Sequence, residues 1–321
     1  MPGSKCTVLL LTLLLTLSAC SQRQLVMPAS GGRPYDVVVV GDQDTVVAPM
    51  LTQETPGLPQ SEPLFTVVQM RGNQLSGSAR LARSIVVVET DSSRYDHTSI
   101  NYVRNVYARP QRIVYITAPS AQSIAQEVRP KVLQLLLMRH EMGISIDRLR
   151  RKHNKKLSQR VSRTFGVEML IPHTMKKVKQ GDGFLWMSDN RPDCSTNICI
   201  YTSENRDSVM HINIKGETDQ MYMATVEGST LQSTLKKGKQ SITVKRGLWQ
   251  MEGDAMGGPW VSHTLEDAQT GRVVVAEAFV YAPGHDKRNL LFEAEAALMT
   301  MKPAAKTSAT ETTAGGKKKR K

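Results

Sequence analysis

Long apolar runs, cysteines and aromatic side chains are all scarce in this chain of 321 residues. The one long apolar run, residues 6–17, is about 12 residues long, whereas a membrane-spanning helix needs roughly 20. No second run follows, so no transmembrane helix is expected. Aromatic residues make up 5% of the sequence, and only two of the four cysteines lie beyond residue 20. Two cysteines are too few for a structural zinc site, and neither a metal nor a cofactor is predicted.

The signature motifs of several enzyme classes are also absent. The sequence has no phosphate-binding P-loop, no dinucleotide-binding G-x-G-x-x-G and no G-x-S-x-G nucleophile elbow. His140 and Glu141 begin a zinc-protease pattern, but Ile144 stands where the second histidine ligand is required. We therefore predict no catalytic residue, and a non-catalytic role is favoured over an enzymatic one.

The net charge of +13 is concentrated in two stretches, which argues against a nucleic-acid-binding face. Residues 147–163 carry eight basic residues and one acidic residue, and residues 302–321 carry seven and one. Neither stretch contains the aromatic residues that usually accompany such faces. Leu149, Leu157 and Val161 recur at helical spacing in the first stretch, so its basic residues should form the exposed face of a helix. The second stretch is of low complexity and should be a disordered tail.

The first 20 residues are typical of a lipoprotein signal peptide. The apolar run ends in Leu17-Ser18-Ala19-Cys20, which resembles a bacterial lipobox, with a plain signal peptide as the alternative. In that resemblance the Cys20 thiol is lipidated and the chain is cut before it. Two or more acyl chains give stable membrane attachment, so the expected partner is a membrane.

The other two cysteines, Cys194 and Cys199, stand close together in "CSTNIC". In an oxidising compartment this spacing favours a small disulfide loop, and two free thiols are the alternative.

Apolar patterning predicts an α+β protein with largely antiparallel sheets, a central helical pair at about 120–165 and a C-terminal helix. The first central helix should end near Gly143, with a kink at Pro130, and the second should run over 146–165. The arrangement suggests two α/β-sandwich halves. The expected parts are a signal peptide (1–19), a lipid-anchored tether (20–34), an N-terminal α/β half (35–166), a β-rich half with a closing helix (167–301) and a basic tail (302–321).

Two features point to a candidate binding site in the C-terminal half. Residues 246–263, "RGLWQMEGDAMGGPWVSH", place Trp249 and Trp260 beside a glycine turn. Indole rings there either fill a core or stack on a ligand such as a sugar.

The second feature is the carboxylate of Glu277, the one charged side chain in the apolar segment 273–281. A buried carboxylate needs a partner. A hairpin in which paired residue numbers sum to about 538 sets Glu277 opposite Val261 and diagonal to His263. Arg246 is the rival partner, and a slip of one residue would set Glu277 opposite Trp260.

Several segments together resemble the Bacteroidota lipoprotein family catalogued as domain of unknown function 4837. They are "PGLPQSEPLF", "YARPQ", "RDSVM", "YMAT", "RGLWQMEGDAMGGPWVSH" and "FVYAP" followed by "DKRNLLFEAEAAL", and the resemblance runs from about residue 33 to 301. It implies a cell-envelope lipoprotein and no known activity. In lipoproteins of that phylum, acidic residues just after the lipidated cysteine resemble a surface-export signal, and "SQRQL" contains no acidic residue. We therefore expect an outer-membrane protein that faces the periplasm, with surface display as the alternative.

The sequence is best interpreted as a binding or structural module with an envelope protein or polymer as partner. The alternative is an enzyme acting on an envelope polymer, with a site near Trp260, His263 and Glu277.

Overall fold

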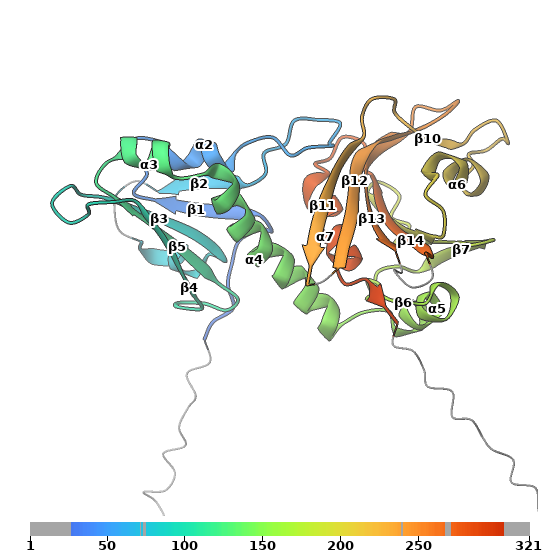
Figure 1. The fold of residues 1–321 in the computed structure, drawn as a ribbon, viewed down its shortest axis with the longest axis horizontal. Coiled ribbons are helices and arrows are strands. Elements are labelled where there is room, and N and C mark those ends of the chain that lie inside the picture. Colours follow the sequence, from blue (N-terminus) through green and yellow to red (C-terminus); the bar gives the residue numbers. More distant parts are fainter. Residues whose placement is uncertain (1–26, 71, 73–74, 239, 267–270, 305–321) are drawn as a thin grey trace, which may run out of the picture.

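The computed structural model describes residues 27–70, 72, 75–238, 240–266 and 271–304. Within them the chain forms two lobes, which one long helix, α4, connects (Figure 1). The mixed helices and sheets confirm the predicted α+β class. The signal peptide, Cys20 and the tail beyond residue 304 lie outside the described residues.

The N-terminal lobe is built on a five-stranded sheet in the order β2-β1-β3-β5-β4. Its strands are β1 (Asp36–Val40), β2 (Thr66–Met70), β3 (Ser84–Thr90), β4 (Ser99–Arg104) and β5 (Arg112–Ala118). The pairs β1–β2, β1–β3 and β3–β5 are parallel, and only β4 runs antiparallel to its neighbour. The short helices α2 (Val47–Leu51) and α3 (Ala121–Glu127) and the first half of α4 pack on one face. Parallel strands are connected by crossover helices, and these helices cover a face of the sheet. This covering explains why β1 and β3 are rich in valine and largely buried.

The C-terminal lobe is built on an eight-stranded antiparallel sheet in the order β10-β12-β13-β14-β9-β8-β7, with β11 paired to β12. Its strands are β7 (Lys177–Gly181), β8 (Phe184–Ser188), β9 (Ser195–Tyr201), β10 (Met223–Thr225), β11 (Leu231–Lys237), β12 (Gln240–Met251), β13 (Gly257–Glu266) and β14 (Val273–Tyr281). A two-stranded ribbon pairs β6 (Val167–Glu168) with β15 (Lys302–Pro303). The helices are α5 (Lys155–Phe165), α6 (Arg206–Asn213) and α7 (Arg288–Leu298).

The apolar patterning of the sequence does not mark β4, β7 or β11 as strands. Most of their side chains are exposed or half-buried. They therefore lack the apolar alternation by which a half-buried strand is recognised.

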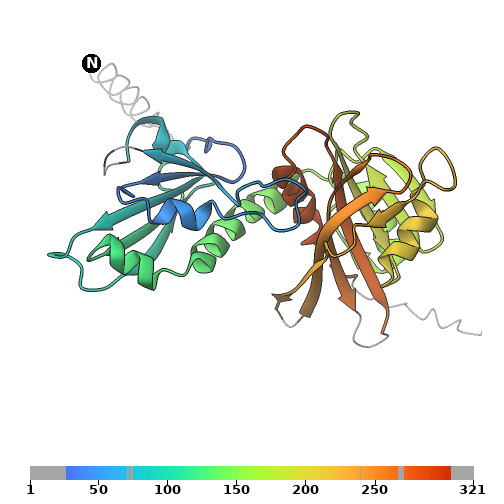
Figure 2. The ribbon, with the colours of Figure 1, turned by 90° about the horizontal axis from the view of Figure 1, so that it is seen from above.

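Two helices connect the lobes through their side chains. Along α4 (Pro130–Arg151), Leu133 and Leu137 enter the N-terminal core, whereas Leu149 enters the C-terminal core. Phe292 of α7 reaches back and packs on Tyr35, with ring centroids 4.9 Å apart. Both lobes therefore share apolar contacts with the same two helices. Figure 2 shows from above the ribbons of α4, in green, and α7, in red, between the two sheets.

The central helical pair divides at different points from those predicted. Pro130 opens α4 instead of kinking a longer helix, and α4 continues through Gly143 to Arg151. Glycine costs only about 1 kcal/mol in a helix interior, so without a capping group it does not end one. The break falls before α5, where the Asn154 side chain accepts a hydrogen bond from the Leu157 N–H.

The predicted exposure of the basic helix face is confirmed. Leu149, Leu157 and Val161 are buried in the C-terminal core. Every basic residue between positions 148 and 163 is exposed: Arg148, Arg150, Arg151, Lys152, Lys155, Lys156, Arg160 and Arg163. None of the described helices is long and apolar enough to cross a membrane.

Candidate functional site

The C-terminal sheet has two differently covered faces, which we call inner and outer. Helices α5 and α7 and the end of α4 cover the inner face. On the outer face α6 covers the middle. Alternate residues of each strand point to opposite faces, so the sheet divides the predicted site residues into two groups.

Arg246 and His263 lie on the inner face, where both bind Glu295 of α7. The Arg246 Nη2–Glu295 Oε1 distance is 2.5 Å, and the His263 Nε2–Glu295 Oε1 distance is 3.1 Å. Burial opposes ionisation of Glu295, but Arg246 and His263 outweigh it and lower its pKa to about 2. This cluster attaches α7 to β12 and β13.

Trp249, Trp260 and Glu277 lie on the outer face, so the predicted contact between Glu277 and His263 is wrong. The paired residues of β13 and β14 sum to 539, which sets Glu277 opposite Ser262 and Ala278 opposite Val261. A register shift of one residue changes which side chains of the two strands lie on the same face of the sheet. Arg246, the rival partner, is also separated from Glu277 by the sheet.

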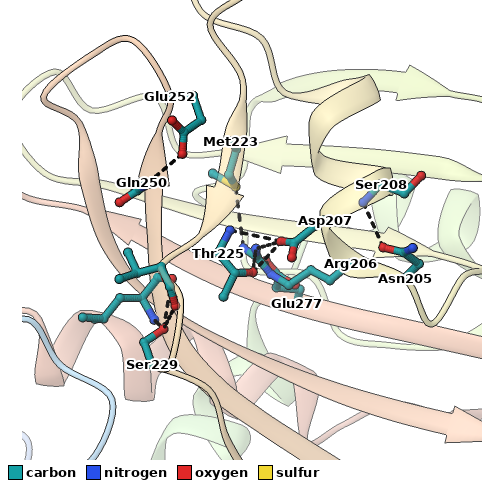
Figure 3. A network of polar contacts seen from close by, with 12 residues as sticks. Asn205, Arg206, Asp207, Ser208, Met223, Thr225, Ser229, Gln250, Glu252 and Glu277 are labelled. Carbon is teal, nitrogen blue, oxygen red and sulfur yellow. Dashed lines mark hydrogen bonds and ion pairs between the residues drawn. The ribbon is translucent and has the colours of Figure 1, made fainter.

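Glu277 is nevertheless buried and paired, as its position in an apolar strand predicts. Arg206, the first residue of α6, donates to both carboxylate oxygens, from Nη2 at 2.8 Å and from Nε at 3.0 and 3.1 Å (Figure 3). The Tyr201 hydroxyl donates to Oε2 at 2.9 Å. Burial raises the pKa of Glu277, and the charge and hydrogen bonds of Arg206 counter it. Trp260 closes the site from one side, because its ring centroid lies 4.3 Å from the Arg206 guanidinium carbon.

Sequence reasoning missed Arg206 as a site residue. It stands 71 positions from Glu277, in a helix that Asn205 caps by accepting from the Ser208 N–H at 3.0 Å. Arg206 Nη1 also donates to the Thr225 hydroxyl at 2.8 Å, which connects α6 to β10 (Figure 3). One feature of the sequence indicated this arginine: it lies in "RDSVM", one of the segments that resemble the DUF4837 family.

An aromatic hollow of about 460 Å³ opens on the outer face beyond Glu277, and we call it the aromatic pocket. Its walls include four aromatic side chains, Trp186, Trp249, Phe279 and Tyr281, together with Ile214, Met223, Met251 and Met256. Polar groups at the rim come from Ser188, Asn190, Arg191, Ser195 and Asn197.

The indole N–H groups of this pocket are already used by the protein. Trp186 Nε1 donates to Asn197 Oδ1 at 3.0 Å, and Trp249 Nε1 donates to the Val280 carbonyl at 3.2 Å. These bonds hold the rings in place, so what they offer a ligand is apolar ring surface. Trp186 and Tyr281 are only half-buried, whereas Trp249 is buried among its neighbours.

The glycines beside the tryptophans allow close packing. A Cβ at Gly258 would collide with the Val280 carbonyl oxygen, and a Cβ at Gly247 would lie 3.1 Å from the Trp260 ring. Gly257 and Gly258 belong to strand β13, so the predicted glycine turn at these positions is wrong. The close packing at the glycines leaves Trp249 in a wall of the aromatic pocket and Trp260 in the core. A smaller hollow of about 230 Å³, bordered by Trp260 and Arg206, opens at the other end of the outer face.

Cys194 and Cys199 are both free thiols, so the structure has the stated alternative and not the favoured disulfide. Cys199 lies on the outer face between Glu277 and Trp186, and burial raises the pKa of its thiol well above the usual value. Cys194 packs on the inner-face core instead. No three His, Cys, Asp or Glu side chains of the described residues gather in a way that could hold a metal ion.

Comparisons with known proteins divide the chain at the break between α4 and α5. Residues 154–300 match the model of a domain of unknown function, DUF4837, and residues 30–150 match that of another, DUF8532. The expected DUF4837 resemblance from residue 33 is therefore too long, because its first half belongs to a separate model. No curated protein matches the chain.

Among solved structures, one from Bacteroides thetaiotaomicron VPI-5482 is 16% identical, with a TM-score of 0.25. The match covers 44% of this chain and 46% of that one, so the chain spans less than half of the length of that structure. By the family models, the C-terminal lobe matches DUF4837, as the sequence resemblance predicts, and the N-terminal lobe matches DUF8532.

Proposed function

We propose that this protein is a lipid-anchored binding module of the cell envelope whose aromatic pocket holds its ligand. The observation that carries the proposal is the pocket itself, with apolar ring surface on its walls and hydrogen-bonding groups at its rim. Ligand sites are typically apolar hollows of ≈ 300–1,000 Å³ with a few placed polar groups. A saccharide unit of an envelope polymer has the matching chemistry, since it offers one apolar face and a hydroxyl edge.

The positions of the buried acids favour binding over catalysis. An enzyme site near Trp260, His263 and Glu277 would need these groups to converge, but the sheet separates His263 from the other two. Glu277 and Glu295 are each held by an arginine. The lining of the aromatic pocket includes Arg191 but no carboxylate and no histidine, so it offers no acid–base pair for catalysis.

The proposed anchor is the lipidated Cys20, in an outer membrane, with the protein facing the periplasm. The described chain begins at Met27, seven residues later, which can span at most about 25 Å. The N-terminal lobe would therefore stay close to the membrane surface.

Cys20→Ala should release the protein from the membrane fraction, because the acyl chains that hold it would have no attachment site. Fractionation of cells and labelling with a radioactive fatty acid provide the measurement. Cys194→Ala, which leaves the lipobox intact, is the control and should stay with the membranes. A Cys20→Ala protein that still pellets with membranes and takes up the label would contradict the lipid anchor.

Tyr281→Ala should weaken binding of a saccharide to the aromatic pocket about tenfold. Stacking on an aromatic ring contributes about 0.5–1.5 kcal/mol, and 1.4 kcal/mol corresponds to a factor of ten. Titration of tryptophan fluorescence with tri-N-acetylglucosamine measures the affinity. Tyr222→Ala is the matched control, because Tyr222 is also half-buried but stacks on His211 outside this pocket. Equal saccharide affinity in the parent chain, Tyr281→Ala and Tyr222→Ala would contradict the aromatic pocket as the binding site.

A further inference from the structure

A further hollow, of about 330 Å³, lies on the inner-face side of the C-terminal sheet, and we call it the basic cleft. Helices α4 and α7 and the segments around residues 172–176 and 189–196 enclose it. It is lined by Ser145, Arg148, Leu149, Lys152, Pro172, His173, Thr174, Met175, Lys176, Asp189, Arg191, Thr196, Leu290, Glu293 and Ala294. Its lining includes none of the binding residues predicted from the sequence and none of the aromatic side chains of the aromatic pocket.

The lining combines an excess of positive charge with an apolar wall. Four Lys or Arg side chains and two carboxylates border the cleft, which leaves a net charge of +2 before His173 is counted. Leu149, Met175 and Ala294 are buried beneath the cleft, and the half-buried Pro172 and Leu290 supply apolar surface that a ligand can reach. A purely hydrophilic ion would leave this surface in contact with water, whereas a neutral apolar molecule would leave the cations unused.

Both carboxylates of the cleft are already engaged by arginines. Asp189 Oδ2 accepts from Arg191 Nε at 2.8 Å, and its Oδ1 accepts from the Thr196 N–H at 3.0 Å. Glu293 Oε1 accepts from Arg148 Nη1 at 2.8 Å.

The two lysines have no such partner. Among the residues that the structure describes, the ammonium groups of Lys152 and Lys176 take part in no hydrogen bond and no ion pair. Lys152 directly follows α4, and Lys176 directly precedes β7. The two lysines are 24 positions apart in the sequence. The fold thus brings two unneutralised cations to one apolar hollow.

We propose that the basic cleft binds a small anionic amphiphile, such as a short acyl chain that ends in a phosphate group. Lys152 and Lys176 contact the anionic head, and the half-buried Pro172 and Leu290 contact the chain. A phosphate is favoured because lysine binds it as a point charge and needs no bidentate geometry. The volume lies at the lower end of the range for ligand pockets, so the chain is short. This site is distinct from the aromatic pocket, although Arg191 borders both.

Calorimetric titration with n-octyl phosphate tests the proposal on the chain from residue 20 onward, carrying Cys20→Ala. We expect n-octyl phosphate to bind at least tenfold more tightly than either inorganic phosphate or octan-1-ol, because only the amphiphile uses both parts of the cleft. The affinity should fall with added salt, since the head group binds through charge.

The double variant Lys152→Gln/Lys176→Gln should bind n-octyl phosphate at least tenfold more weakly. The matched control is Lys155→Gln/Lys156→Gln, which removes the same charge from exposed lysines of α5 that do not line the cleft. The control should bind within about twofold of the parent chain, because a charge lost outside the cleft is largely screened by salt.

Three outcomes would overturn the proposal. The first is the absence of measurable n-octyl phosphate binding, and the second is an equal loss in the two double variants, which would reveal a non-specific charge effect. The third is loss of binding in Tyr281→Ala, which would place the amphiphile in the aromatic pocket. The Lys152→Gln/Lys176→Gln variant should still bind the saccharide, because neither lysine lines the aromatic pocket. Saccharide titration of this variant therefore distinguishes a failure of this proposal from a failure of the proposed function.

Discussion

Glu277→Gln should lower the free energy of unfolding by about 3–5 kcal/mol, the range for removing one partner of a buried ion pair. The Glu277 side chain is 0% exposed and that of Arg206 is 10% exposed. Glutamine would leave the buried guanidinium with only the exposed Asp207 carboxylate, 3.4 Å from Nη1, as a counter-charge. Tyr201 would also lose an ionised acceptor. Equilibrium unfolding in urea at constant pH measures the change.

Two further variants make this experiment decisive. Glu293→Gln removes a carboxylate from an exposed pair with Arg148 and should change the free energy of unfolding by less than about 1 kcal/mol. The double variant Arg206→Met/Glu277→Gln should recover much of the loss, because no unpaired charge stays buried. If Glu277→Gln folds with unchanged stability and instead loses ligand binding, the pair belongs to a binding site and its structural role is wrong.

Gly258→Ala should destabilise the protein by about 3 kcal/mol or more, the upper end of the range for overpacking. An added Cβ would meet the Val280 carbonyl oxygen of the neighbouring strand and would lie 3.1 Å from Trp249 Nε1. That carbonyl accepts the Trp249 indole N–H, so the same substitution should shift the tryptophan fluorescence of the folded protein. Thermal unfolding and emission spectra provide the two measurements.

The control for this substitution is Gly143→Ala in the interior of α4. No atom lies within 4 Å of an added Cβ there, and alanine is favoured over glycine in a helix by about 1 kcal/mol. We therefore expect opposite signs for the same chemical change at the two positions. A Gly258→Ala protein as stable as the parent chain would show that β13 and β14 can separate without cost.

Local patterns in the sequence determined the features that depend on near neighbours along the chain. The apolar segment 273–281 predicted the hairpin of β13 and β14, and helical spacing predicted that Leu157 and Val161 are buried below a basic face. The apolar surroundings of Glu277 in its own strand were enough to predict that its carboxylate is buried and paired. Each of these properties follows from side-chain direction within one element, which has a fixed period.

Only the tertiary structure decided which residues meet. The register of β13 and β14 differs by one residue from the predicted one, and this step places His263 and Glu277 on opposite faces of the sheet. Arg206 of α6 pairs with Glu277, and Glu295 of α7 pairs with Arg246. In both pairs the helix lies far along the sequence from the strand that it meets.

The same holds for the division of the chain and for both hollows. The helix break at Asn154 depends on a capping hydrogen bond, and the parallel N-terminal sheet depends on where crossover helices pack. The aromatic pocket and the basic cleft each combine side chains from several elements. A local pattern carries no information on such contacts, because their free energy depends on surfaces that meet only after the chain has folded.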